Sequence, residues 1–313
     1  MQIVERRRPH ALIYLESLLA RTPSHHPSYP DLKEKLRRRS AGFAGECWFD
    51  RVWLDYETTE PFKVISDLQL PLHQIDSLCI FPSFILIVEI KNISGLIQMD
   101  GNSRQFARTL NGETIGMANP DDQLYRHEKR IRQLTGNKIP VIGIVVFTNP
   151  NCVLQINNID RRIIHFSGFP YILDSLIAQY REFPKFNIQE NVDLFLSLQL
   201  LQKVHEPDLI SSQLATGIFC SLCAFVKMHY SKGLWRCPTC SLKDPHAHLV
   251  AMQDYRLLIN NTISNREFRQ FTGLSSRTNA TKLLQSSGFQ TIGSHKSLRY
   301  VIPEIDWRGG SGL

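Results

Sequence analysis

Residues 84–91 read FILIVEIK, an apolar run that is interrupted only near its end, by Glu89 and Lys91. This composition is typical of a buried β-strand. Successive side chains of a strand point to opposite faces, so Glu89 and Lys91 lie on the same face. The stretch therefore predicts a buried strand with a carboxylate and an ammonium group side by side at its C-terminal end.

A second strand is predicted directly upstream, at residues 73–80, which read HQIDSLCI. The link between the two strands, residues 81–84, has the composition of a turn. Pro82 disfavours the two-residue turns that need a positive φ, so a four-residue loop is expected. The two runs should therefore form an antiparallel hairpin in which residue 80 faces residue 85.

This register places Asp76 opposite Glu89 and Gln74 opposite Lys91, whereas a slip of one residue would turn Asp76 to the other face. Facing Cβ atoms in such a ladder lie about 4.5–5.5 Å apart, so two carboxylates can share one ion. Two facing carboxylates are unfavourable unless one is protonated or a cation bridges them. Oxygen ligands favour Mg²⁺ or Mn²⁺ over zinc, and the lysine can hold an attacking water or a phosphate.

The alternative is an edge hairpin whose Glu89 and Lys91 only face solvent, because isolated Glu-x-Lys strings are common. Asp76, at a distance compatible with the hairpin, favours the metal site over this alternative. The sequence therefore predicts a two-carboxylate metal site with an adjacent lysine.

The first two hundred residues together predict an α/β domain. Helices are expected at 9–21, 31–40, 43–56, 121–135, 170–182 and 189–206, and further strands at 62–70, 95–100, 104–110 and 141–147. The helix at 121–135 lies between two strands, as a crossover connection in a mixed sheet does.

Several short motifs of this region occur in an order that resembles one family. They are Gly42-Phe-Ala-Gly45-Glu46, Gln74-Ile-Asp76, Val88-Glu89-Ile-Lys91-Asn92 with Gly95, Gln105-Phe106-Ala-Arg108, and Asn119-Pro120 with Gln123. Together they resemble the NERD domain, the nuclease-related domain of the PD-(D/E)xK nuclease superfamily. The resemblance covers about residues 9–200, and it implies a restriction-endonuclease-like mixed sheet flanked by helices.

The resemblance also implies roles for five residues in cutting phosphodiester bonds with Mg²⁺ or Mn²⁺. Asp76 and Glu89 would be the metal ligands, and Lys91 would be the catalytic lysine. Glu46 would be a helical acidic residue aimed at the same site, and Gln123 a polar residue from the following helix.

Other interpretations of these helical residues stay open. Glu46 and Gln123 also suit ordinary positions early in a helix, where the helix dipole favours acidic groups and the first turn is polar. His127, one turn after Gln123, is interpreted as a bystander. Ile75 stands where the superfamily has a proline before the first aspartate, at a position that is loosely kept.

A zinc ribbon is predicted behind this domain. The pairs Cys220-x-x-Cys223 and Cys237-x-x-Cys240 are separated by 13 residues. Four thiolates at this spacing are typical of a closed, structural zinc site, and two pairs together favour zinc over a redox role. Residues 251–303 are then expected to form a small helical domain that resembles a helix-turn-helix with a wing at 296–302, although any compact cap of three helices has a similar pattern.

The excess positive charge lies in the last third of the chain. Residues 1–215 hold 24 basic and 24 acidic side chains, whereas residues 216–313 hold 12 and 5. Such an excess favours a phosphate-backbone partner, although a merely soluble basic domain would also carry it. The candidate nucleic-acid contacts are the basic and aromatic residues of this region: Lys227, Lys232, Trp235, Arg236, Arg277, Lys282, Lys296 and Arg299.

The whole sequence predicts four parts: an N-terminal helical region (1–40), a nuclease-like domain (41–210), the ribbon (216–248) and the helical domain (251–303). No apolar run reaches the roughly 18–20 residues of a membrane helix. Seven scattered cysteines argue against a disulfide framework, so a cytoplasmic protein with no membrane partner is expected.

The expected function is a metal-dependent nuclease that acts on nucleic acid. DNA is the first candidate substrate, although the sequence separates neither DNA from RNA nor one oligomeric state from another. One alternative is a non-catalytic DNA-binding adaptor that keeps a nuclease-like scaffold. Another, a zinc-dependent protein-interaction module, is disfavoured by the positive charge.

Overall fold

The chain forms two compact units. A computed structural model describes residues 2–4, 6–100, 103–156, 162–200, 213–223 and 225–307. The first unit contains residues 1–7 and 40–202, and the second contains residues 8–39 and 203–313. The division falls within one helix, α2 (Tyr29–Asp50). None of the helices in the described ranges is both long enough and apolar enough to cross a membrane.

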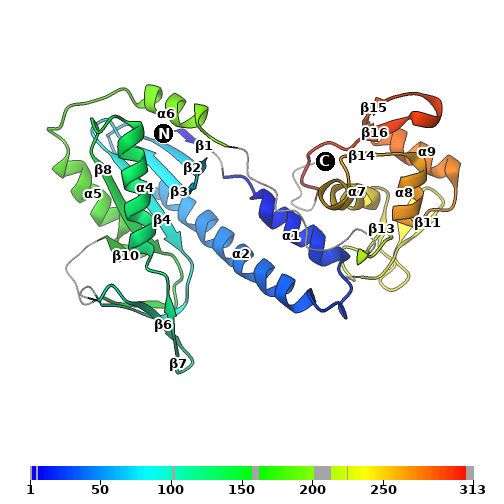
Figure 1. Cartoon of the computed structure of the whole chain (residues 1–313), viewed down its shortest axis with the longest axis horizontal. Helices are drawn as coiled ribbons and strands as arrows, with labels where there is room; N and C mark the ends of the chain where they lie inside the picture. The colour runs from blue at the N-terminus through cyan, green and yellow to red at the C-terminus, as the bar shows by residue number, and fades with distance from the viewer. Residues whose placement is uncertain are drawn as a thin grey trace. The chain divides into compact units, whose positions relative to one another are not determined.

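The first unit is built on a six-stranded mixed sheet in the order β1-β2-β3-β4-β8-β10 (Figure 1). Its strands are β1 (Gln2–Val4), β2 (Lys63–Leu70), β3 (His73–Ile80), β4 (Ile85–Lys91), β8 (Val141–Phe147) and β10 (Ile163–His165). Strands β2, β3 and β4 are antiparallel, whereas β4, β8 and β10 are parallel. The predicted mixed α/β fold is therefore confirmed.

The β3–β4 hairpin has the predicted register. Ile80 faces Ile85, and Ser77 faces Val88. The loop is closed by the N–H of Phe81, which donates to the carbonyl oxygen of Phe84 at 3.0 Å. The next positions along the two strands are Asp76 and Glu89, at the end of the hairpin that is remote from the loop.

Helices cover both faces of this sheet. On one face lie α4 (Pro120–Leu134) and α6 (Ile188–Ser197), which bury Leu124 and Phe195 in the same cluster as Ile85 and Ile87. On the other face lie the end of α2, α3 (Val52–Asp55) and α5 (Phe169–Gln179), in one cluster with Leu86 and Val88. Because β4 and β8 are parallel, the predicted crossover through α4 is also confirmed.

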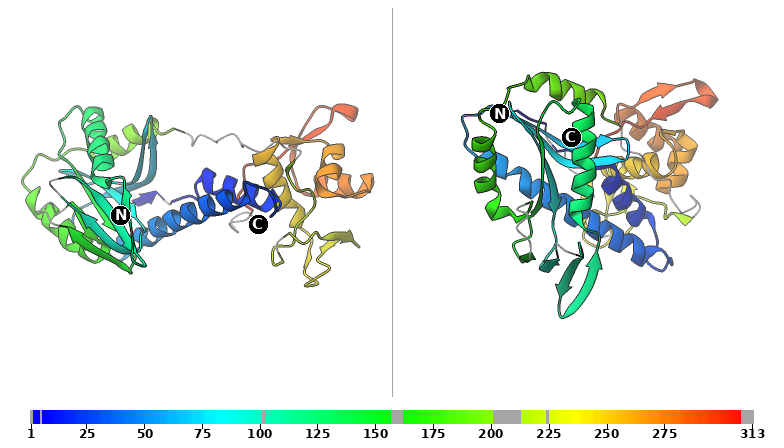
Figure 2. Two further views of the ribbon diagram at one scale, coloured as in Figure 1. Left: turned by 60° about the horizontal axis from the view of Figure 1, so that its bottom comes forward. Right: turned by 60° about the vertical axis from the view of Figure 1, so that its left-hand side comes forward.

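A second, four-stranded sheet belongs to the same unit. It contains β5 (Gly95–Met99), β6 (Phe106–Leu110), β7 (Glu113–Met117) and β9 (Cys152–Ile156), in the order β7-β6-β5-β9. The hairpin of β6 and β7 projects from the rest of the unit (Figure 2). Every residue of β7 is exposed, so this strand has no apolar face by which its sequence could be recognised.

The predicted break between helices at 31–40 and 43–56 is wrong. Helix α2 continues through Gly42 to Asp50 and is followed only then by the short helix α3. A glycine inside a helix costs only about 1 kcal/mol relative to alanine. The burial of Phe49 and Trp53 against the sheet offsets this cost.

The second unit combines two N-terminal helices with the C-terminal part of the chain. Its elements are α1 (His10–Arg21), the first part of α2, β11 (His229–Ser231), β12 (Leu234–Arg236), β13 (Lys243–Asp244), α7 (Ala247–Leu258), β14 (Thr262–Ile263), α8 (Asn265–Thr272), α9 (Arg277–Ser286), β15 (Gln290–Ile292) and β16 (Arg299–Val301). Tyr14 and Leu18 of α1 pack in one cluster with Leu214 and Leu258. Residues 8–39 therefore share a core with the C-terminal part.

Helices α8 and α9 are joined by a tight turn at Gly273, whose φ is 77°. Helix α8 begins with a capping box, because Ser264 and Glu267 exchange hydrogen bonds at its start. Strands β15 and β16 form a hairpin after α9. This order is that of a helix-turn-helix followed by a wing.

A buried ion pair fastens α1 to α7 in the second unit. The Nε of Arg21 lies 2.7 Å from the Oδ2 of Asp254, and the two side chains are 2% and 0% exposed. The guanidinium also donates to the carbonyl oxygen of Gly217 at 2.6 Å. Arg21→Met removes one partner of this buried ion pair and should lower the free energy of unfolding by about 3–5 kcal/mol, measured by urea denaturation.

Arg37→Met is the matched control for this prediction. Arg37 pairs with Glu34 on the surface of α2, where solvent screens the two charges. The control should leave the unfolding free energy nearly unchanged. Equal effects of the two substitutions would contradict the structural role of Arg21.

Candidate active site and metal centre

Two carboxylates lie on neighbouring strands at the open end of the β3–β4 hairpin. Asp76 is 9% exposed and Glu89 is 2% exposed. The Oδ2 of Asp76 accepts a hydrogen bond from the backbone N–H of Ile90 at 2.8 Å. This bond ties the Asp76 side chain to β4, beside Glu89.

Lys91 connects Glu89 to helix α4. Its Nζ donates to the Oε1 of Glu89 at 2.7 Å and to the Oε1 of Gln123 at 3.3 Å. Helix α4 begins at Pro120 with the side chain of Asn119 as its cap, which accepts a hydrogen bond from the N–H of residue 121. The start of α4 thus brings Gln123 to the lysine.

The absence of a side chain at Gly143 lets α4 pack tightly against β8. A Cβ atom at this position would lie 2.5 Å from the Cγ of Leu124 and 2.8 Å from the Oε1 of Glu128. Any larger residue would push the helix away from the sheet. The glycine therefore helps to hold Gln123 and His127 near β4.

His127 lies one helical turn after Gln123 and faces the second oxygen of Glu89. Its Nδ1 is 3.6 Å from the Oε2 of Glu89. Within the described ranges, neither atom has a hydrogen-bond partner, although both are buried. The ring of His73 packs edge-on against His127 with centroids 5.3 Å apart. Burial, and then the neighbouring His73, lower the pKa of His127 to about 4, so its imidazole is neutral at pH 7.

The carboxylates of this region resist ionisation. Burial, reinforced by repulsion from Asp76, raises the pKa of Glu89 to about 8. Burial also raises the pKa of Asp76, although the Ile90 N–H and Lys91 act in the opposite direction. Groups of this kind favour either a proton or a bound cation.

Glu46, in the last turns of α2, is held by an arginine that the sequence analysis did not single out. Arg6 donates from NH1 to the Oε2 of Glu46 and from Nε to the Oδ2 of Asp50, both at 2.7 Å, and from NH2 to the carbonyl oxygen of Asp76 at 2.8 Å. The Arg6 side chain is only 2% exposed. Burial and the nearby Asp76 raise the pKa of Glu46 to about 7.

The approach of α2 to this site depends on Gly45. A Cβ atom there would lie 2.4 Å from the Cβ of Asn92, the residue after Lys91. The side chain of Asn92 also donates to the carbonyl oxygen of Ala41 at 2.8 Å. Helix and strand are therefore fixed to each other where Glu46 approaches Asp76.

The raised pKa values predict a pH-dependent stability in the absence of Mg²⁺ and Mn²⁺. The folded protein binds the Glu89 proton more tightly than the unfolded chain, whose carboxyl has an ordinary pKa near 4.5. The protonated form therefore stabilises the fold at low pH, and this contribution should be lost as the pH rises from about 4.5 through about 8. Urea unfolding between pH 6.5 and pH 8.5 measures the loss, because below pH 6.5 the lowered pKa values of His127 and His248 change the stability in the opposite direction.

Glu89→Gln should flatten this pH profile, because the amide does not titrate. Glu113→Gln, which changes an exposed glutamate of β7, is the control and should leave the profile as in the wild type. A free energy of unfolding that rises over this range in the wild type would contradict the prediction.

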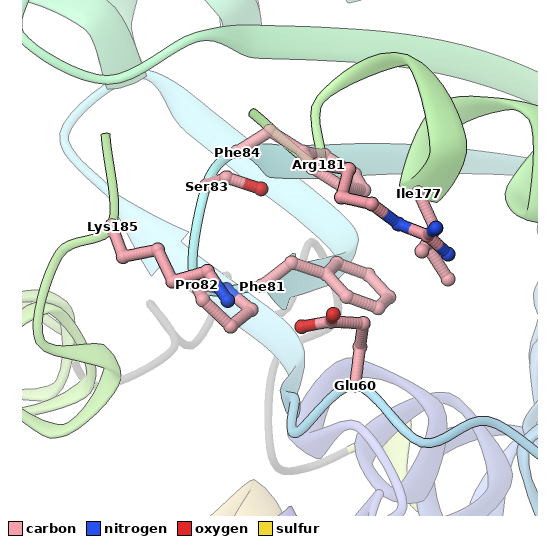
Figure 3. Close-up of a pocket in the computed structure, with 8 residues that line it drawn as sticks. All are labelled: Glu60, Phe81, Pro82, Ser83, Phe84, Ile177, Arg181 and Lys185. Atoms are coloured by element: carbon pink, nitrogen blue, oxygen red, sulfur yellow. The ribbon is translucent and has the colours of Figure 1, made fainter. Parts of the chain in front are cut away.

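A small pocket at the loop end of the hairpin is a separate feature. It is lined by Phe81 to Phe84 together with Glu60, Ile177, Arg181 and Lys185 (Figure 3). Its volume of about 10 Å³ is little more than the space that one water molecule needs. It does not include Asp76, Glu89 or Lys91, so it is not part of the candidate site.

The four cysteines form a separate centre in the second unit. Cys220, Cys223, Cys237 and Cys240 have their Sγ atoms within 4.8 Å of one another, and no other set of three or more potential ligands gathers so closely in the described parts of the chain. Glu46 accordingly does not join Asp76 and Glu89 in a cluster of three ligands. The backbone N–H of Cys240 lowers the pKa of Cys237 to about 6, whereas the thiol of Cys240 raises the pKa of Cys223 to about 12, so a bound cation is needed to hold all four as thiolates.

The candidate nucleic-acid contacts of the second unit differ in how exposed their side chains are. Lys227, Lys232, Arg277, Lys282 and Lys296 are exposed, and Arg236 is half-buried. Trp235 is 2% exposed, so its ring packs inside the unit and is not available to stack on a base. Arg299 is held by Glu267 and by Thr262, at 2.8 and 2.9 Å.

Comparison with known proteins gives one match. Residues 41–148 match the model of the nuclease-related domain family. No curated protein and no solved structure matches the chain. Glu46, Asp76, Glu89, Lys91 and Gln123 all lie inside the matched segment. The segment that carries the buried carboxylates and their lysine therefore matches the nuclease-related domain family.

Proposed function

We propose that the chain is a divalent-metal-dependent nuclease that hydrolyses phosphodiester bonds, with DNA as its first candidate substrate. A nuclease-related domain implies a nucleic-acid partner in general. The observation that carries the proposal is the position of Lys91, whose ammonium group bonds to Glu89 and Gln123 next to the carboxylate of Asp76. A lysine between a metal-binding carboxylate and a polar helical residue suits the binding of an attacking water and a phosphate.

Asp76 and Glu89 fit a magnesium or manganese ion. The Oε2 atom of Glu89 is buried and, in the residues described, has no hydrogen-bond partner. A positive ion between the two carboxylates would favour their charged forms and so lower the raised pKa values of both groups. When bound, such an ion would make a water molecule more acidic and offset the negative charge of the phosphate.

The residues around the ion would have separate roles in binding the substrate and in positioning the carboxylates. Lys91 would orient the water or a phosphate oxygen, and Gln123 would keep the lysine in place. The Ile90 N–H fixes the direction of the Asp76 carboxylate. Arg6 and Glu46 lie behind Asp76 and would hold α2 against the site.

We propose that the four cysteines bind one structural zinc ion. Four protein ligands leave no open position for water, so the ion would stabilise the ribbon and take no part in hydrolysis. None of the seven cysteines forms a disulfide, which supports the proposed cytoplasmic location.

The second candidate function is a non-catalytic adaptor that binds DNA and keeps the nuclease-like scaffold. The complete set of Asp76, Glu89 and Lys91 favours the enzyme, since a scaffold does not need two buried carboxylates beside a partly exposed lysine. Incubation of supercoiled plasmid, linear duplex, single-stranded DNA and RNA with Mg²⁺, Mn²⁺ or no divalent ion tests the choice. Metal-dependent cleavage of any of these supports the enzyme, and binding without cleavage of all four supports the adaptor.

We further propose that exposed lysines of the second unit bind the phosphate backbone. Lys227, Lys282 and Lys296 lie in the ribbon, in α9 and between β15 and β16. Each phosphate that a lysine neutralises contributes about −0.9 to the slope of log affinity against log salt for duplex DNA. Changing all three to glutamine in the full chain should therefore weaken binding and flatten the slope by about two to three units.

A triple variant of Lys129, Lys138 and Lys185, which are exposed lysines of the first unit, removes the same charge elsewhere. Fluorescence anisotropy of a labelled duplex across a salt series compares the three proteins. If the two triple variants have the same slope, the second unit is not the principal phosphate-binding surface.

A further inference from the structure

Helix α4 presents two polar side chains to β4 from the same face. Gln123 and His127 are four residues apart, which places them one above the other on a helix. Gln123 reaches Lys91, and His127 faces Glu89. The two side chains therefore approach the two adjacent functional groups of the strand, in the reverse of their chain order.

The environment of His127 is unusual for a residue of the core. Its side chain is 4% exposed, its Nδ1 faces the carboxylate of Glu89, and no hydrogen bond to this atom is made within the described residues. A buried ring nitrogen without a partner is unfavourable by about 1–3 kcal/mol. Such an arrangement is expected where a bond forms only in the working state of a site.

We infer that His127 is a positioning residue for Glu89, and that its Nδ1–H donates to the Oε2 of Glu89 when the carboxylate binds a divalent ion. This inference rests on the proposed metal-dependent function. The separation of 3.6 Å exceeds a hydrogen bond by less than 1 Å, so a small rotation of the carboxylate closes it. Metal-binding carboxylates are commonly held by a hydrogen bond of this kind.

The surroundings of the ring favour this one role. The edge-on contact with His73 restricts the rotation of the His127 ring, and Gly143 allows the helix to come close enough. The other oxygen of Glu89 is occupied by Lys91. With one oxygen held by the lysine and the other by the histidine, the carboxylate would have a single orientation toward the ion.

Two substitutions separate the donor atom from the bulk of the side chain. The amide nitrogen of asparagine occupies nearly the place of the histidine Nδ1, whereas leucine fills the space without a donor. His127→Leu should weaken Mn²⁺ binding by about 10–100-fold, and His127→Asn should stay within about threefold of the wild type. Lys129→Asn, an exposed position of the same helix, controls for the cost of asparagine in a helix.

Titration of the full-length, zinc-loaded protein with Mn²⁺, followed by electron paramagnetic resonance of the free ion, gives the dissociation constants. Thermal melts in the absence of Mn²⁺ show whether each variant is folded. If His127→Leu does not fold, His127→Gln replaces it, because its donor lies near the Nε2 position and should likewise weaken binding.

Three results are distinguishable. Weak Mn²⁺ binding by the leucine or glutamine variant, with near-normal binding by asparagine, supports the inference. Wild-type affinity in all variants, or an asparagine variant as weak as leucine, overturns the inference while the metal site itself stands. A wild-type protein that binds no Mn²⁺ overturns the proposed metal-dependent function.

Discussion

Lys91→Ala should reduce the rate of metal-dependent cleavage by about 10²–10⁴-fold, the usual loss when a group that assists proton transfer is removed. The ammonium group is the contact between the Glu89 carboxylate and the side chain of Gln123. Alanine leaves no group at this place to orient water or a phosphate oxygen. Single-turnover cleavage, with enzyme in excess over a labelled substrate, measures the chemical step without product release.

The fold should survive this substitution. Lys91 is a quarter exposed at the end of β4, and its removal leaves the apolar faces of the strand in place. Lys185→Ala, an exposed lysine of the same unit, is the matched control and should cleave at the wild-type rate. A Lys91→Ala protein that is folded and as active as this control would show that the assigned lysine takes no part in the reaction.

Cys237→Ser should abolish zinc binding and unfold the ribbon, which is the largest stability effect expected in the chain. Structural zinc sites in small domains contribute on the order of 10 kcal/mol at neutral pH. The wild-type protein should carry one zinc ion per chain by elemental analysis. Hydrogen exchange should then show loss of protection chiefly in β11 and β12 of the variant, with β3 and β4 unaffected.

Cys47→Ser is the control for this second prediction, because Cys47 lies in α2 outside the four-cysteine cluster. It should keep the zinc and the protection of the ribbon. Purified wild-type protein without zinc, prepared in the absence of chelators, would contradict the zinc assignment.

The hairpin could be predicted from the sequence because its determinants are local. Pro82 selects the loop length, and the apolar run of β4 fixes which residues are buried. Together they give the pairing of Ile80 with Ile85 and hence the proximity of Asp76 and Glu89. The four cysteines could be predicted to gather for a similar reason, since their spacing is itself the signal.

Features that depend on distant parts of the chain could not be predicted in this way. Arg6 contacts residues that are 40 or more positions away, and no pattern near it marks it as buried. Strand β1 has three residues and is defined only by its pairing with β2. Residues 8–39 were expected as part of a separate N-terminal region. Their amphipathic pattern predicts helices but does not identify the C-terminal part of the chain as the surface against which they pack.

His127 illustrates a further limit of sequence analysis. The spacing from Gln123 places both residues on one face of a helix, but it does not say which face meets β4. The packing of α4 depends on Gly143, which lies several residues after the helix and leaves room for it to pack closely on the sheet. The sequence interpretation of His127 as a bystander could not take account of its approach to Glu89, which is the observation that argues for a role.

The central claim is that water, activated at the site of Asp76, Glu89 and Lys91, breaks a phosphodiester bond of nucleic acid. The most direct measurement is cleavage in water enriched in oxygen-18 with Mn²⁺ present, followed by mass spectrometry of the terminal phosphate of the products. Hydrolysis at this site predicts labelled phosphate from the wild-type protein and product formation about 10²–10⁴-fold slower from Lys91→Ala. No cleavage by the zinc-loaded wild type, or labelled product formed equally fast by Lys91→Ala, would contradict the account.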